Sequence, residues 1–77
     1  MTKSAFKSVL EEILSVPTGT LKETDTRDTI EEWSSLADVE ILTLVLSEFG
    51  IETDNELLQY ESVGELLGIL ERRRAFA

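Results

Sequence analysis

The sequence contains no cysteine, no histidine and a single proline. Without cysteine the chain has neither a disulfide framework nor a thiolate site, and without histidine it lacks the commonest general base and zinc ligand. Carboxylates are the main acid or base groups left, and no pair of them stands in an arrangement typical of a catalytic cleft. We therefore expect a protein that is not an enzyme and that has no catalytic residues and no metal site.

Long apolar runs and basic side chains are also scarce. Residues 1–10 contain no apolar run long enough for a signal peptide, and no stretch approaches the length of a membrane span. Seven basic residues stand against 16 acidic ones, which gives a formal net charge of -9. This charge repels nucleic acid and anionic lipid surfaces. We expect a cytoplasmic monomer that binds neither nucleic acid nor membranes and whose partners have basic surfaces.

The few basic residues are unevenly distributed. Arg27 is the only one between Glu23 and Glu71, and three consecutive arginines follow at residues 72–74. The helix dipole favours cations at a helix C-terminus, and no aromatic residues are interleaved with these arginines as they are in nucleic-acid sites. We interpret the arginine run as a helix end.

A length of 77 residues with 42% hydrophobic residues allows one domain, expected over residues 1–77. Over residues 3–15 apolar side chains recur at helical spacings, which predicts an amphipathic first helix. Val16 and Pro17 end this pattern, because proline cannot continue the helical hydrogen bonds. A long loop over residues 18–34 follows. Its apolar anchors are Leu21, Ile30 and Trp33, and we expect a packing role for the tryptophan.

Residues 35–49 are rich in leucine and predict the second helix, and Gly50 follows where a left-handed C-terminal cap would lie. This helix has apolar residues on both faces. The expected core face consists of Ile41, Leu42, Val45, Leu46 and Phe49. The opposite face consists of Leu36, Ala37, Glu40, Thr43, Leu44 and Glu48.

Two shorter helices are expected in the rest of the chain. Residues 55–60 carry enough apolar side chains for a packed turn or two. Ser62 and Glu65 fit a capping box, which predicts a last helix over residues 62–74. Gly64 and the glycine four residues after it mark places where a second backbone could approach closely. The expected fold is all-α, a four-helix bundle.

The motif Trp33-Ser34-Ser35-Leu36 places a serine hydroxyl at the junction between the long loop and the second helix. Backbone amides at a helix N-terminus point outward and favour negative charge, so a phosphodiester would be stabilised there. Three further segments accompany this junction. They are the run of residues 35–42 (SLADVEIL), residues 48–51 (EFGI) and residues 62–66 (SVGEL).

Together these segments resemble the acyl and peptidyl carrier protein family, phosphopantetheine-binding proteins whose signature is Asp-Ser-Leu at the start of the second helix. The resemblance spans nearly the whole chain. It implies an acyl-carrier-type four-helix bundle with a long loop between helices 1 and 2 and a short third helix. It also implies that a phosphopantetheinyl transferase attaches 4′-phosphopantetheine from coenzyme A to Ser35. The arm would hold an acyl or aminoacyl thioester for fatty acid, polyketide or nonribosomal peptide biosynthesis.

The resemblance also implies a recognition face for partner enzymes on the second helix. Its residues are Leu36, Asp38, Val39, Glu40 and Thr43. A solvated charged face with stray leucines is an alternative interpretation, although Leu44 outside the expected core face favours an interface. A last group could either line an acyl pocket or simply build the core. It consists of Val45, Leu46, Leu57, Leu58 and Val63.

Alternatives remain open for the serine itself. Ser34 stands where the family has its aspartate, so an acidic contact expected by the loading enzyme is missing. Ser35 could instead be an ordinary helix N-cap, with Asp38 as its capping partner. The chain could then be an unmodified carrier-like adaptor that acts through noncovalent protein binding.

Overall fold

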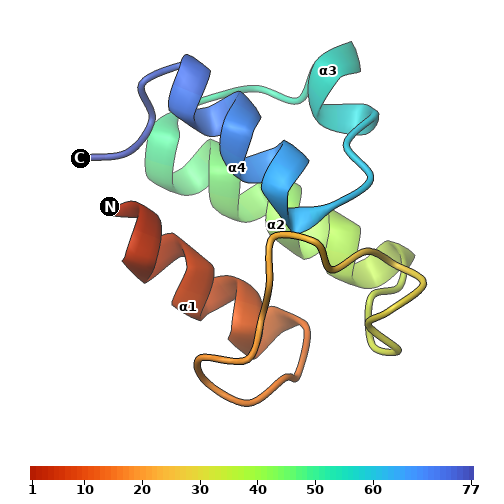
Figure 1. Cartoon of the computed structure of the whole chain (residues 1–77). Helices are drawn as coiled ribbons and strands as arrows, with labels where there is room; N and C mark the ends of the chain where they lie inside the picture. Colours follow the sequence, from red (N-terminus) through yellow and green to blue (C-terminus); the bar gives the residue numbers. More distant parts are fainter.

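The computed structural model describes residues 1–77 as four helices without a strand (Figure 1). The helices are α1 (Lys3–Ile13), α2 (Ser35–Phe49), α3 (Asn55–Leu58) and α4 (Val63–Arg72). The prediction of an all-α protein is confirmed, and α2 has the predicted bounds. The other three helices are shorter than predicted. None of the four combines the length and the apolar character needed to cross a bilayer.

The long loop between α1 and α2 sweeps along one side of the molecule, while the two termini lie together on the other side (Figure 1). α1 packs against α2, and the short α3 packs against α4. At the termini the Ala77 backbone N–H donates to the Met1 carbonyl oxygen at 3.1 Å, and Lys3 forms an ion pair with Glu71. Both ends of the chain are therefore attached to the folded domain.

The core is one contiguous set of buried side chains contributed by every helix and by the long loop. Its members are Phe6, Leu10, Leu14, Leu21, Ile30, Trp33, Ala37, Ile41, Val45, Leu57, Tyr60, Val63, Leu66, Leu67, Ile69 and Leu70. The rings of Phe6, Phe49 and Phe76 pack together, with each pair of centroids 5.6 Å apart. Tilted and edge-on pairs of this kind are favourable, and they hold the C-terminal segment against α1 and α2.

α1 ends two residues earlier than predicted because the chain reverses at Ser15, before Pro17 is reached. Ser15 has a left-handed φ of 56°, and the Val16 N–H donates to the Glu11 carbonyl oxygen at 3.0 Å. This is a Schellman pattern, which is more often built on glycine. Arg74 ends α4 in the same way, also with a φ of 56°. The predicted end of the last helix is therefore two residues too late.

The predicted C-cap of α2 and the predicted capping box of α4 are confirmed. The Ser62 Oγ accepts from the Glu65 N–H at 3.1 Å, and the Glu65 carboxylate accepts from the Ser62 N–H at 3.2 Å, which completes the capping box. Gly50 follows α2 in the left-handed conformation, with a φ of 67°. α3 is shorter than predicted because the chain leaves the helix at Gln59 and carries Tyr60 into the core.

The expected core face of α2 is partly wrong. Ile41 and Val45 are buried as expected. Ala37, which the sequence placed on the opposite face, is buried too, whereas Leu46 is 51% exposed. Leu44, which the sequence placed on the opposite face, is half-buried against the core. Because apolar residues occur on both faces, hydrophobic periodicity alone does not determine the rotation of this helix about its axis.

The long loop is held by backbone contacts to the start of α4. The Val63 N–H donates to the Asp25 carbonyl oxygen at 3.0 Å, and the Gly64 N–H donates to that of Glu23 at 2.8 Å. A Cβ atom at Gly64 would lie 3.0 Å from the same Glu23 oxygen, so the predicted close approach is confirmed there. At Gly68 no neighbouring atom lies within 4 Å of the equivalent position, so no backbone approaches.

A buried carboxylate on α1 gives the loop a second attachment. Glu11 is only 5% exposed. Its Oε2 atom accepts from the backbone N–H of Gly19 at 2.7 Å and from that of Leu21 at 3.1 Å. Hydrogen bonds to an ionised acceptor are among the stronger ones, and they offset the cost of removing the charge from water. The loop is therefore anchored at both α1 and α4.

Candidate functional site

Ser35 is the first residue of α2 and its side chain is exposed. The residue before it provides the helix cap: Ser34 has an extended backbone, and its Oγ accepts from the Ala37 N–H at 3.4 Å. The alternative in which Ser35 is the N-cap is therefore wrong. Because Ser34 has this role, the Ser35 hydroxyl is left available at the positive end of the helix dipole.

The first turn of α2 is attached to the rest of the molecule through Asp38. The Arg27 guanidinium donates two hydrogen bonds to this carboxylate, from Nε to Oδ2 at 3.1 Å and from Nη2 to Oδ1 at 2.9 Å. Its Nη1 donates to the Tyr60 carbonyl oxygen at 3.1 Å. Bidentate pairs of arginine and carboxylate add geometric specificity as well as energy. Arg27 thereby joins the long loop, α2 and the connection between α3 and α4.

Two aromatic side chains complete this arrangement, which we call the Asp38 network (Arg27, Trp33, Asp38 and Tyr60). Trp33 Nε1 donates to Asp38 Oδ1 at 2.7 Å, and the Tyr60 hydroxyl donates to the same oxygen at 3.2 Å. The Arg27 guanidinium carbon lies 5.1 Å from the Trp33 ring centroid and 5.0 Å from that of Tyr60, within the range of cation–π attraction. Trp33 is buried, so its expected packing role is confirmed.

The network shifts the pKa values of its members. Partial burial alone would raise the Asp38 pKa, but the hydrogen bonds from Arg27 and Trp33 outweigh it and hold that pKa below its usual value. Burial, together with the nearby Asp38 charge, raises the pKa of the Tyr60 hydroxyl. At neutral pH Asp38 is therefore a carboxylate and Tyr60 a proton donor, as the observed bonds require.

Four of the five residues expected on the recognition face lie together on the surface of α2. Leu36 is 69% exposed and Val39 is 57% exposed, and Glu40 and Thr43 are exposed as well. Val39, Glu40 and Thr43 follow Leu36 by three, four and seven residues, which places all four on one side of the helix. Asp38 differs from the other four, because its carboxylate is already bound within the network.

The five residues considered as either pocket or core are divided by the structure. Val45, Leu57 and Val63 are fully buried in the core. Leu46 is 51% exposed and Leu58 is 62% exposed. Because two of the five lie on the surface, the set does not enclose one cavity.

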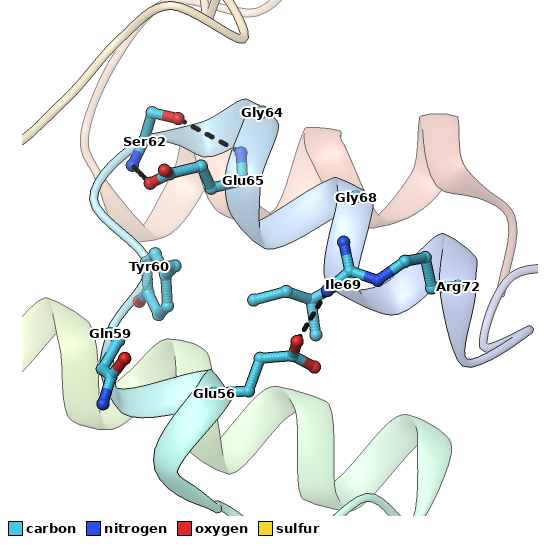
Figure 2. Close-up of a pocket in the computed structure, with 9 residues that line it drawn as sticks. All are labelled: Glu56, Gln59, Tyr60, Ser62, Gly64, Glu65, Gly68, Ile69 and Arg72. Atoms are coloured by element: carbon cyan, nitrogen blue, oxygen red, sulfur yellow. Dashed lines mark hydrogen bonds and ion pairs between the residues drawn. The ribbon is translucent and has the colours of Figure 1, made fainter.

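A hollow of about 530 Å³ lies between α3 and α4 (Figure 2). An ion pair between Glu56 and Arg72, 2.7 Å long, lies toward one end, and the capping box of α4 lies at the other. Gly68 lines the hollow without a side chain to fill it. Tyr60 lines it too, and its hydroxyl connects this wall to Asp38. The hollow therefore shares one residue with the Asp38 network.

The chemistry that these residues can perform unaided is limited. No three His, Cys, Asp or Glu side chains are placed to hold a metal ion together. The acid closest in sequence after Ser35 is Asp38, and it is a stable carboxylate engaged by three other side chains. A serine hydroxyl is a weak nucleophile unless a neighbouring base activates it. The site offers an accessible alcohol that a second protein could modify.

Sequence reasoning missed three residues that shape this site and its loop. Arg27 stands out in the sequence only as the sole basic residue of an acidic region, a signal that could have indicated an internal partner. Tyr60 was assigned to a helix, although a lone tyrosine beside a turn commonly needs a partner for its hydroxyl. Glu11 gave no signal beyond being an acid next to the apolar face of α1.

Comparisons with known protein families, with curated proteins and with solved structures find no match. Function is therefore inferred from the residues and their geometry.

Proposed function

We propose that this chain is a carrier-type four-helix domain that holds an acyl or aminoacyl thioester on a 4′-phosphopantetheine arm attached to Ser35. The observation that carries this proposal is the exposed Ser35 side chain on the first residue of α2, with Ser34 supplying the helix cap. The resemblance of residues 35–42, 48–51 and 62–66 to carrier proteins supports it further. The domain then works as a cytoplasmic carrier and has no catalytic role of its own.

The local charge suits a phosphodiester at this serine. The unpaired amides and the dipole at the start of α2 favour an anion there. The first carboxylate of α2 along the chain, that of Asp38, is matched by the Arg27 guanidinium. A phosphodiester on Ser35 therefore meets less repulsion from the first turn of α2 than an unpaired Asp38 would exert.

The loading step needs an enzyme, because this chain has no base placed to activate the serine. In this step the Ser35 Oγ forms a bond to the coenzyme A phosphorus that bears the pantetheine arm, while the pyrophosphate P–O bond breaks. Adenosine 3′,5′-bisphosphate leaves, and the serine proton passes to a base of the transferase. The transferase and its Mg²⁺ supply the activation.

A carrier function also gives a role to the exposed face of α2. Leu36 and Val39 provide apolar contact area, and Glu40 adds an unpaired charge for a basic partner surface. A tethered thioester that visits several enzymes meets each one at a raised effective concentration. The domain then needs only an anchor for the arm and a surface that partners recognise.

The direct test is phosphopantetheine loading in vitro. We expect the intact mass of the chain to rise by one phosphopantetheine after incubation with coenzyme A, Mg²⁺ and a broad-specificity transferase. Ser35→Ala abolishes this gain, whereas Ser34→Ala, the matched change at the neighbouring hydroxyl, retains it. No gain, or a gain that persists in Ser35→Ala, contradicts the proposal.

An unmodified adaptor is the second candidate, favoured by Ser34 in place of the family aspartate and by an apolar α2 face that is exposed without any modification. For an adaptor, Ser35→Ala leaves partner binding intact, and Leu36→Ala weakens it. A carrier instead loses its output in Ser35→Ala, because loss of the anchor removes the cargo.

A further inference from the structure

A stretch of six residues at the start of α2, residues 33–38, contains the proposed attachment site; we call it the Ser35 corner. Both ends of the corner are joined to each other, because Trp33 Nε1 at one end donates to Asp38 Oδ1 at the other at 2.7 Å. In between, Ser34 caps the helix through the Ala37 N–H. Ser35 therefore lies within a short segment closed by side-chain hydrogen bonds.

Arg27 attaches this closed segment to the rest of the domain. Its guanidinium holds both oxygens of Asp38 and also the Tyr60 carbonyl oxygen, at distances of 2.9 to 3.1 Å. The rings of Trp33 and Tyr60 lie 5.1 and 5.0 Å from its guanidinium carbon. Its contacts reach Asp38 in α2, Trp33 at the end of the loop and Tyr60 in the α3–α4 connection, so removal of this one side chain weakens the attachment of the corner to the rest of the domain.

We propose that Arg27 is a positioning residue that holds the Ser35 hydroxyl in the place and orientation from which the transferase takes it. This inference rests on the proposed function and adds a residue of the long loop to it. A nucleophile held in one orientation reacts faster than one that samples many, since the ordering has been completed before the encounter. The exposed face of α2 that a partner touches does not include Arg27.

Because Arg27 lies outside the docking face of α2, we expect its removal to affect kcat more than KM. In Arg27→Gln the docking face is unchanged, so the KM of the transferase for this carrier stays within about twofold, while kcat falls about tenfold. Arg27→Lys keeps the positive charge but cannot form the planar two-point contact with Asp38, so its kcat falls nearly as far. Arg73→Gln, which removes an arginine from an ion-pair cluster elsewhere, loads at the wild-type rate.

A double-mutant cycle shows whether Arg27 acts through Asp38. If it does, Arg27→Gln combined with Asp38→Asn loads no more slowly than the slower single variant, because both changes break the same attachment. Independent effects would instead multiply. Circular dichroism of each variant checks that the helices remain, and Arg27→Lys serves as the folded variant if Arg27→Gln loses structure.

The measurement is the steady-state rate of phosphopantetheine transfer from coenzyme A to the full chain by a broad-specificity transferase, followed by intact mass. If the wild-type chain is not loaded, the proposed function fails and this inference falls with it. If the wild type is loaded and Arg27→Lys matches it, only the positioning role is wrong. Faster loading of Arg27→Gln also overturns it, since Arg27 would then be masking an acidic contact.

Discussion

Two clusters of arginine and carboxylate side chains occupy different parts of this domain and differ in burial. In the Asp38 network the two charged side chains are 36% and 28% exposed and lie against two buried aromatic rings. In the second cluster, here called the α3–α4 cluster (Asp54, Glu56, Arg72 and Arg73), the carboxylate side chains are 50% and 46% exposed, and the two arginines are 64% and 27% exposed. The clusters therefore differ in the burial of their carboxylates. The bonds in both clusters are similarly short.

The difference in surroundings decides what each cluster can do. Exposed ion pairs contribute little to stability, because water competes for both charges and the side chains lose freedom. A partly buried carboxylate that accepts from several donors leaves those donors unsatisfied when it is removed. We therefore expect the Asp38 network to hold its segments firmly, whereas the α3–α4 cluster adds only a weak attachment for the short α3.

The largest expected effect is the removal of the central acceptor. Asp38→Ala leaves the Arg27 guanidinium, the Trp33 indole N–H and the Tyr60 hydroxyl without their shared partner, so we expect the free energy of unfolding to fall by about 2–3 kcal/mol. Urea denaturation followed by circular dichroism measures this loss. A loss no larger than that of an exposed ion pair would mean that the network is loose in solution.

The stability of the domain at acid pH should also depend on Asp38. Because the Asp38 pKa is lowered in the folded state, its contribution is present above the unfolded value of about 3.9 and is lost as the pH falls through the folded value. Asp38→Asn should therefore flatten the acid limb of the stability curve. Urea titrations at a series of pH values below neutrality test this. If Asp38→Asn leaves the acid limb unchanged, the loss of stability at low pH comes from other carboxylates and the prediction is wrong.

The two serines of the Ser35 corner should differ in what they contribute to the free energy of unfolding. Ser34→Ala removes the N-cap of α2, so we expect a loss of about 1 kcal/mol in the free energy of unfolding. Ser35→Ala, one residue further, should change it by less than about 0.5 kcal/mol, because the side chain is exposed and is not the cap. Thermal melts of the two variants compare them directly. Equal losses would contradict the assigned cap.

The smallest expected effect belongs to the α3–α4 cluster. Glu56→Gln should lower the free energy of unfolding only slightly, and far less than Asp38→Ala does, and high salt should reduce the difference further. Urea denaturation of wild type and variant at low and high ionic strength measures both. If Glu56→Gln matched Asp38→Ala, burial would not be the property that separates the two clusters.

The sequence predicted a helix end well where a local signal marks that end. Gly50 marks the end of α2 as a left-handed terminator, and Ser62 with Glu65 marks the start of α4. The end of α1 was placed too late because Ser15 takes a left-handed conformation that is unusual for a residue with a side chain. Such a reversal depends on how the next segment packs against the helix, and it leaves no clear trace in composition.

The site was predictable only in part. The position of Ser35 at the loop-to-helix junction follows from the motif, and the exposed Leu36 follows from helical spacing, whereas the exposed Val39 was expected only from the resemblance to carrier proteins. The bonds from Arg27 and Tyr60 to Asp38 join residues 11 and 22 positions apart. Contacts over such separations are set by how the loop and helices pack, which periodicity does not encode. Sequence alone therefore indicated the proposed attachment residue but not the network around it.

The mass of the chain purified from the cell in which it naturally occurs tests the central claim most directly. We expect a population that is heavier by one phosphopantetheine, and we expect fragmentation to place the added group on the peptide that contains Ser35. A chain that always has the mass of its amino acids alone, or that carries the group on Ser34 instead, would contradict the account.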